Sequence, residues 1–172
     1  MRAVAMAGSV AVLSALTGCG FALRQAPKFA FDSVRVTGLE NTSMSRALQQ
    51  AMLASGIQVA NSSEAGALTP ATATPGLVVL TVILDQHERV VAGQNASGEV
   101  RELTLRARFR FRLNTATGKD LLEETELMLE RDISFSESDA LAKAAEETMM
   151  FRDMDGDIVQ QVLRRLAAVK SL

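Results

Sequence analysis

The chain has 172 residues, a length typical of one domain, and its 48% hydrophobic and 22% charged residues suit a packed core rather than an intrinsically disordered chain. With 18 Lys and Arg against 20 Asp and Glu, the net charge of −2 lacks the basic excess of a nucleic-acid-binding protein. The absence of Trp and Tyr removes most of the aromatic residues with which lectins stack sugars.

The amino terminus has the features of an export signal. Arg2 precedes an apolar run from Ala3 to Leu16, which is shorter than the roughly 20 residues needed to span a bilayer. The segment Leu16-Thr17-Gly18-Cys19 resembles the lipobox of bacterial lipoproteins, with a small residue directly before the cysteine. We therefore predict a lipoprotein signal peptide over residues 1–18 and a single domain over residues 19–172.

Cys19 is the only cysteine of the chain, so no internal disulfide can form. The lipobox resemblance implies that its thiol and its new amino group carry acyl chains such as palmitate, which together give a stable lipid anchor. Gly20 stands where an Asp would signal retention at the inner membrane, and this implies sorting to the periplasmic side of the outer membrane. The alternative is a free or buried cysteine after a coincidental apolar stretch.

The first part of the predicted domain combines a strand with a helix. Val34 and Val36 alternate with polar residues, which predicts a strand that ends at Gly38. Thr42 or Ser43 can cap a helix, which Gly56 ends. The apolar positions of this helix share one stripe and are Met44, Ala47, Leu48, Ala51 and Met52.

The middle of the chain contains two further strands and a loop. Ile57 to Ala60 is a short second strand, and the Pro, Gly, Ser and Thr residues of Asn61 to Gly76 show no periodicity and predict a mobile loop. Leu77 to Leu84 is apolar and rich in β-branched residues, as in a central strand, and could continue to Val91. A turn is expected over Ala92 to Gly98.

A long amphipathic strand follows. Its apolar side chains point to one face and are Leu103, Leu105, Ala107, Phe109, Phe111 and Leu113. Its other face carries Glu102, Thr104, Arg106, Arg108, Arg110 and Arg112. We call the last four residues the arginine ladder. Guanidinium groups bind phosphate and carboxylate oxygens in bidentate fashion, so the ladder is a candidate contact for an extended polyanionic surface.

A hairpin loop from Thr115 to Asp120 leads into a return strand. One face of this strand is apolar and carries Leu127, Leu129, Ile133 and Phe135. The other face is acidic and carries Glu124, Glu126, Glu130 and Asp132. Cross-strand pairing with these carboxylates is the structural alternative to ligand binding by the arginine ladder, and different arginines can do either.

Two helical patterns, Asp139 to Met150 and Met154 to Val169, finish the chain as two helices or one kinked helix. The order of strand, helix, strands and helix predicts an α+β fold, a two-layer sandwich in which helices pack on one face of a mostly antiparallel β-sheet. The apolar side chains between the layers would form a core, and a lipid cavity is the less favoured alternative.

The chain shows no motif for catalysis or cofactor binding. Its one histidine, His87, has no metal-ligand spacing around it and is expected on the surface. The acidic run from Asp153 to Asp157 imitates a calcium-binding loop, but Arg164 occupies the position that requires a Glu. We therefore predict no enzyme activity, no metal site and no cofactor.

Four segments, in their order and spacing, carry a family resemblance. They are Cys19-Gly20-Phe21-Ala22-Leu23-Arg24, the strands Phe31 to Val36 and Arg106 to Phe111, and the carboxy-terminal run with Glu146-Glu147, Met154, Asp157-Ile158 and Leu163-Arg164-Arg165-Leu166. Together they resemble the LptE (RlpB) family of lipopolysaccharide-assembly lipoproteins over essentially the whole mature chain.

This resemblance implies an outer-membrane lipoprotein that plugs the LptD β-barrel, assists its assembly and takes part in inserting lipopolysaccharide into the outer leaflet. The family is implied to bind lipopolysaccharide through basic residues, and we expect the arginine ladder to contact its phosphates. The alternative is a structural or pilot lipoprotein of another outer-membrane complex with no role in lipid binding. Neither function involves nucleic acid.

Overall fold

A computed structural model describes residues 27–61 and 76–172. The predicted signal peptide, Cys19 and most of the predicted loop over Asn61 to Gly76 lie outside the described residues. The described elements are, in chain order, β1 (Ser33–Gly38), α2 (Ser43–Ala54), β2 (Gln58–Asn61), β3 (Leu77–Gln94), β4 (Val100–Thr115), β5 (Asp120–Ser134), the short 3₁₀ helix η3 (Glu137–Asp139) and α3 (Ala140–Ala167).

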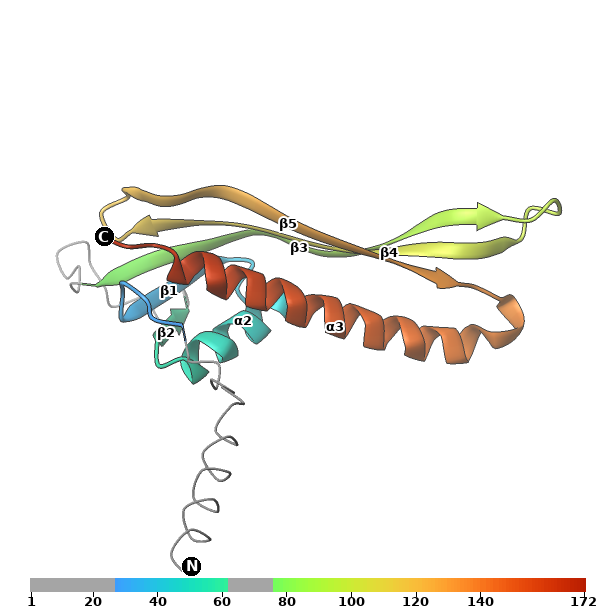
Figure 1. Ribbon diagram of the computed structural model, residues 1–172, viewed down its shortest axis with the longest axis horizontal. Coiled ribbons are helices and arrows are strands. Elements are labelled where there is room, and N and C mark those ends of the chain that lie inside the picture. The colour runs from blue at the N-terminus through green and yellow to red at the C-terminus, as the bar shows by residue number, and fades with distance from the viewer. Residues whose placement is uncertain (1–26, 62–75) are drawn as a thin grey trace, which may run out of the picture.

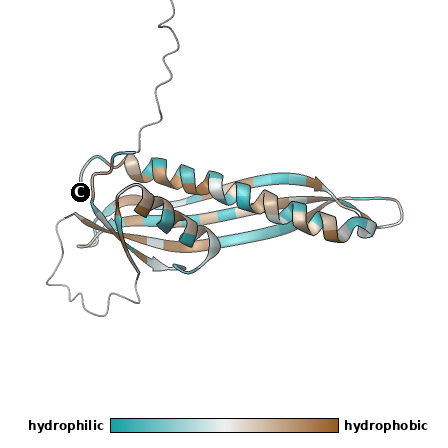
Figure 2. Cartoon of the chain, turned by 90° about the horizontal axis from the view of Figure 1, so that it is seen from below, coloured by the Kyte–Doolittle hydropathy of each residue, from teal (hydrophilic) through white to brown (hydrophobic). Residues whose placement is uncertain are grey.

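The strands form one five-stranded sheet in the order β2-β1-β3-β4-β5. The long pairings, β3 with β4 and β4 with β5, are antiparallel, whereas the short pairings of β1 with β2 and with β3 are parallel. Both helices cover the same face of the sheet (Figures 1 and 2). The predicted α+β fold, with helices on one face of a mostly antiparallel sheet, is confirmed.

The sheet narrows along its length because β1 pairs only with the first third of β3, from Leu77 to Val82. Beyond that point β3, β4 and β5 continue as a three-stranded ribbon, and α3 runs beneath them (Figure 1). We call the end with β1, β2 and α2 the proximal end, and the end with the β3–β4 turn and the start of α3 the distal end. No helix in the described ranges is both long and apolar enough to cross a membrane.

One apolar core lies between the sheet and the helices. All six apolar side chains predicted on one face of β4, from Leu103 to Leu113, are buried in it. The helices add Met44, Leu48, Met52, Met154, Ile158, Val162 and Leu166, each at most 1% exposed. The alternating pattern of β4 therefore identified the buried face, and ordinary core packing accounts for the apolar side chains there.

The structure shifts one predicted boundary and decides one alternative that the sequence left open. The turn predicted over Ala92 to Gly98 is shorter, because Gln94 still pairs with Val100 of β4 and the Asn95 side chain accepts hydrogen bonds from the backbone of the turn. The two carboxy-terminal helical patterns form one continuous helix, α3, with Gly156 in its interior.

The amino terminus of α2 is capped by a residue distant in sequence. Thr42 occupies the predicted cap position, but its hydroxyl donates to the carbonyl oxygen of Leu39 instead of capping the helix. The Asp85 carboxylate of β3 accepts hydrogen bonds from the backbone N–H groups of Met44 and Ser45, at 3.1 and 3.2 Å. This contact ties α2 to the middle of β3 and uses a negative charge at the positive end of the helix.

Candidate functional site

The arginine ladder lies on the face of the sheet that points away from the helices. Leu105, Ala107 and Phe109 alternate with its arginines and are buried on the opposite face. The ladder side chains are only partly covered: those of Arg106 and Arg108 are 31% exposed. The predicted separation of the two faces of β4 is therefore confirmed, and the ladder is open to a ligand or to neighbouring side chains.

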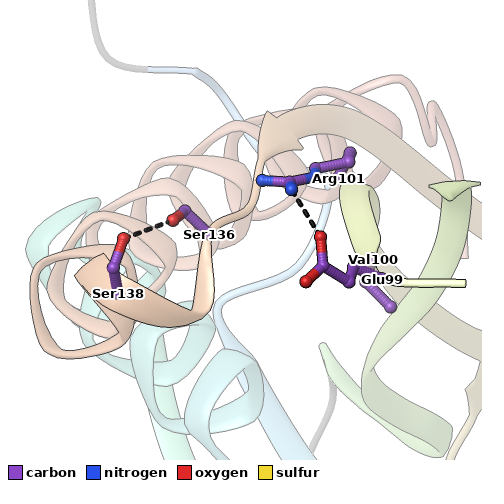
Figure 3. A pocket seen from close by; sticks show the side chains of 5 residues that line it. All are labelled: Glu99, Val100, Arg101, Ser136 and Ser138. Atoms are coloured by element: carbon purple, nitrogen blue, oxygen red, sulfur yellow. Dashed lines mark hydrogen bonds and ion pairs between the residues drawn. The ribbon is translucent and has the colours of Figure 1, made fainter. Parts of the chain in front are cut away.

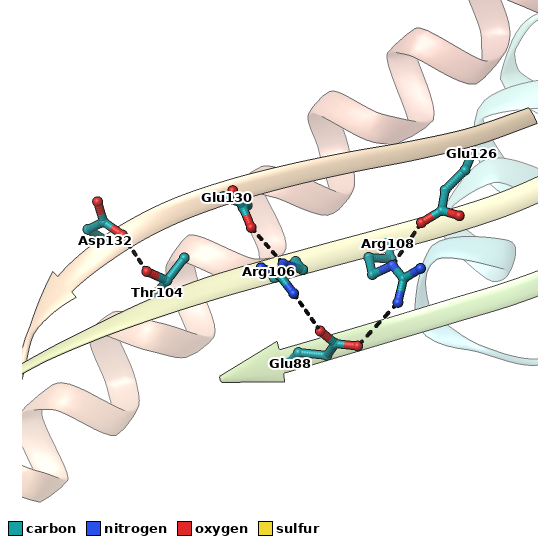
Figure 4. A network of polar contacts seen from close by, with 7 residues as sticks. All are labelled: Glu88, Thr104, Arg106, Arg108, Glu126, Glu130 and Asp132. Carbon is teal, nitrogen blue, oxygen red and sulfur yellow. Dashed lines mark hydrogen bonds and ion pairs between the residues drawn. The ribbon is translucent and has the colours of Figure 1, made fainter. Parts of the chain in front are cut away.

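Carboxylates on both neighbouring strands bind the first two ladder arginines (Figure 4). Arg106 Nε donates to Glu130 Oε1 at 2.6 Å, and Arg108 Nε donates to Glu126 Oε1 at 2.8 Å. On the other side, Glu88 of β3 accepts from Nη1 of both arginines, at 3.3 and 3.5 Å. The result is a chain of alternating charges across three strands.

These contacts alter the ionisation of the groups that make them. The hydrogen bond to Glu130 raises the pKa of Arg106, and the hydrogen bond to Glu126 raises the pKa of Arg108. The same contact with Arg108 lowers the pKa of Glu126. Each shift favours the charged forms, so the network is stable at neutral pH and largely neutralises this half of the ladder.

The sequence predicted the ion-pair partners of the ladder arginines on β5, but it did not predict Glu88 of β3. The register places Glu88 opposite Arg106, and this follows from a β-bulge between Val82 and Leu84 that shifts the alternation of β3 by one residue. Before the bulge, Val78, Leu80 and Val82 face the core, whereas after it Gln86, Glu88 and Val90 share the outer face with the ladder. Sequence periodicity alone gives no sign of that shift.

The proximal half of the ladder keeps more free positive charge. Arg110 contacts Glu124 at 3.2 Å through Nη1, while its buried Nε atom has no hydrogen-bond partner among the described residues. Arg112 is exposed and forms no ion pair within the described ranges. One end of the ladder is thus paired and the other is available.

Arg35 of β1 adds to this free charge. It alternates with the buried Val34 and Val36, so it lies on the same outer face as the ladder, and its buried Nε atom also has no partner within the described ranges. Only β3 separates β1 from β4, and the register places the Cα atom of Arg35 about 12 Å from the Cα atom of Arg112. We call Arg35, Arg110 and Arg112 the proximal arginine patch. The alternation of β1 could have placed Arg35 there in advance.

A small polar pocket of about 230 Å³ opens at the distal end, at the start of β4 (Figure 3). Arg101 contacts Glu99 in it at 2.5 Å, and the hydroxyls of Ser136 and Ser138 bind each other at 2.7 Å. Among the described side chains of its lining, Glu99 is the only carboxylate, and Arg101 and Asn95 already bind it. Among the described side chains, the Ser136 and Ser138 hydroxyls bind each other, and neither is shown bonded to a carboxylate or a histidine that could act as a base.

The helix-facing side of β3 becomes polar after the bulge. His87 lies there, partly exposed as predicted for a surface residue, but its Nε2 atom contacts Asp155 Oδ1 of α3 at 2.6 Å and its ring stacks on Phe151. This contact raises the pKa of His87. The acidic run that imitates a calcium loop is helical, and within the described residues no cluster of three or more His, Cys, Asp or Glu could hold a metal.

Comparison with known proteins places this fold among envelope lipoproteins. The model of the LptE family, described as lipopolysaccharide-assembly, matches residues 31–166. No curated protein sequence matches significantly. The solution structure of an uncharacterized lipoprotein B from Nitrosomonas europaea is similar, with 28% identity, a TM-score of 0.66, and coverage of 87% of this chain and 92% of that chain.

Two crystal structures share the fold at lower identity. Rare lipoprotein B from Shewanella oneidensis has 19% identity and a TM-score of 0.62, with 79% of this chain and 94% of that chain covered. A minor lipoprotein from Acinetobacter baumannii has 18% identity and a TM-score of 0.60, with coverage of 82% and 94%.

Proposed function

The chain belongs to the LptE family, and from this premise we propose that it is an outer-membrane lipoprotein that binds and plugs an LptD-type β-barrel, assists its assembly and helps to insert lipopolysaccharide into the outer leaflet. The observation that carries the proposal is the family match over residues 31–166, which includes every described strand and nearly all of α3. The family consists of non-enzymatic lipoproteins of the cell envelope that associate with LptD.

The outer sheet face supports a contact with the phosphates of lipopolysaccharide. Three arginines there, the proximal arginine patch, combine one exposed guanidinium with two others whose Nε–H donors are unused among the described residues. The exposed Arg112 guanidinium and the partly exposed Arg110 side chain can meet a ligand with several acceptor oxygens directly, and phosphate matches the guanidinium fork. The buried Nε atoms of Arg35 and Arg110 become available only when these side chains move. We therefore assign the first contact to this patch rather than to the whole arginine ladder.

The paired half of the ladder would act differently. Glu88, Glu126 and Glu130 occupy the Nε and Nη1 atoms of Arg106 and Arg108, so a phosphate that binds these guanidinium groups in bidentate fashion through those atoms competes with the carboxylates. Such an exchange has a small net effect, since exposed ion pairs contribute only about 0.2–1 kcal/mol each. Weak, exchangeable contacts along a strand suit a molecule that must be passed on rather than held.

Charge reversal at Arg112 tests the lipid contact. The binding of purified lipopolysaccharide to the full-length protein would be measured for Arg112→Glu, for Arg35→Gln, and for Arg46→Glu as a control on the exposed side of α2. We expect a five-fold or greater loss of affinity for Arg112→Glu and a smaller loss for Arg35→Gln. The control changes the net charge by the same amount as Arg112→Glu. Because Arg46 lies on α2 and not on the outer face of the sheet, the control should change affinity less than two-fold.

The pilot or structural role is the alternative, and the ion pairing of three ladder arginines is the observation that favours it. If Arg112→Glu and Arg46→Glu change lipopolysaccharide affinity equally, the proximal arginine patch has no specific role in lipid binding, and the result supports the pilot or structural role. The lipid anchor has a separate test. Cys19→Ser should release the protein from the membrane fraction, whereas the unaltered chain should carry an acylated amino-terminal Cys19 by mass spectrometry.

A further inference from the structure

The two halves of α3 are held to the sheet in different ways. In the second half, Met154, Ile158, Val162 and Leu166 are fully buried in the core. Among residues 141–153, all of which the structure describes, none is buried. We call residues 140–153 the arm. The arm extends to the distal end beneath β3, β4 and β5 (Figure 1).

Few contacts fasten the arm itself. Arg89 of β3 contacts Glu147 at 3.4 Å, and Lys143 donates to the Ser134 hydroxyl of β5 at 3.1 Å. Met150 and Phe151 are only partly buried where they pack against the core. A segment with few buried apolar contacts and mostly exposed polar ones belongs to the least stable part of a fold.

Two further ion pairs lie where the arm joins the buried half of the helix. Asp155 contacts His87 of β3 at 2.6 Å, and Asp157 contacts Arg131 of β5 at 3.3 Å. Successive helical residues lie about 100° apart, so these two carboxylates leave the helix on nearly opposite flanks. Together they fasten α3 to two strands that β4 separates. We call the two pairs the latch.

Gly156 stands between the two latch carboxylates. A glycine inside a helix weakens it, and a Cβ atom built at this position would meet nothing within 4 Å, so no close packing requires the glycine. Hollows of about 610 and 500 Å³ flank the helix there, and Gly156 and Arg152 line both. The helix therefore has a flexible residue and free space at the same point.

We propose that the arm, together with Met154 and Asp155, detaches from the distal sheet by bending at Gly156, and that the latch pair between Asp155 and His87 keeps it closed. Opening would uncover the helix-facing side of the distal sheet, where Leu103, Leu105 and Ile133 are buried. It would also melt the arm, because a helix of about 14 residues is marginal without packing. This conformational device does not depend on the proposed function.

Hydrogen exchange of the full-length protein, read by mass spectrometry at pH 6, tests the proposal. The arm amides should exchange at least ten-fold faster than those of residues 159–166. Asp155→Asn should accelerate exchange of the arm amides a further five-fold or so without affecting residues 159–166. Asp157 lies beyond the bend at Gly156, so Asp157→Asn should accelerate this exchange less. Asp153→Asn is the matched control, because Asp153 lies on the same helix and forms no ion pair within the described ranges.

Two further variants separate hinge bending from local weakness. Gly156→Ala should slow exchange of the arm about five-fold, the usual advantage of alanine over glycine in a helix. Ala107→Cys places a reporter thiol in the core opposite His87, and this thiol should be labelled faster in the Asp155→Asn background. Equal exchange of the two halves of α3, or equal acceleration by Asp153→Asn, would overturn the proposal.

Discussion

Replacing Glu88 with Gln tests whether the arginine ladder is a structural network, a ligand site or both. Glu88 accepts hydrogen bonds from Arg106 and Arg108 at once, and its side chain is 24% exposed. The substitution keeps the size of the side chain and removes its charge. The closer contacts of the same arginines with Glu130 and Glu126 remain in place.

The expected cost follows from the geometry. Two partly exposed ion pairs at 3.3 and 3.5 Å are each worth about 0.2–1 kcal/mol, so Glu88→Gln should lower the free energy of unfolding by about 0.4–2 kcal/mol. Screening should remove most of this difference at 1 M salt, where the Debye length is about 3 Å. Urea denaturation at low and high salt measures both values.

The same variant should bind lipopolysaccharide more tightly, by about two- to five-fold, because two guanidinium groups lose a shared counter-charge. Glu102→Gln is the matched control, since Glu102 lies on the same face of β4 and forms no ion pair within the described ranges. If Glu88→Gln destabilises no more than Glu102→Gln, or if it weakens lipopolysaccharide binding, the account of a neutralised and exchangeable ladder is wrong.

Three more predictions concern contacts that hold the fold together. The raised pKa of His87, caused first by its hydrogen bond with Asp155 and also by Asp85, means that its contribution to stability is fully present below pH 6.5 and is lost as pH rises through the folded-state pKa. Arg152 lines the hollow beside His87, and the stability difference between pH 6 and pH 9 should shrink in His87→Gln. Asp85→Ala, which removes the cap of α2, should cost about 0.5–2 kcal/mol in urea denaturation. Gly38→Ala should lower the free energy of unfolding by about 2–4 kcal/mol, because φ is 81° and the new Cβ would lie 2.2 Å from the Val82 carbonyl oxygen. Gly56→Ala is the control: φ is 86° but nothing lies within 4 Å of the new Cβ, so the loss should be about 1–2 kcal/mol.

Local patterns predicted the elements well where one face of an element is uniformly apolar. The alternation from Leu103 to Leu113 gave the buried face of β4, and the stripe from Met44 to Met52 gave α2. The acidic face of the return strand likewise predicted the partners Glu124, Glu126 and Glu130.

Features that depend on tertiary geometry could not be predicted in this way. The bulge after Val82 turns Asp85 and His87 toward the helices and Glu88 toward the ladder. A one-residue shift in register cannot be recognised in a polar stretch of sequence, because no apolar alternation identifies the buried face there. The cap of α2 by Asp85 joins residues about 40 positions apart. The parallel pairing that places Arg35 beside the ladder depends on a connection between distant segments.

Purification of the full-length, carboxy-terminally tagged protein from its own outer membrane in mild detergent, with identification of what elutes with it, tests the proposed function. A large LptD-type β-barrel is expected in stoichiometric amount. Recovery of the protein alone, or with a different secretion or assembly complex, would rule out the proposed barrel partner and favour the pilot role.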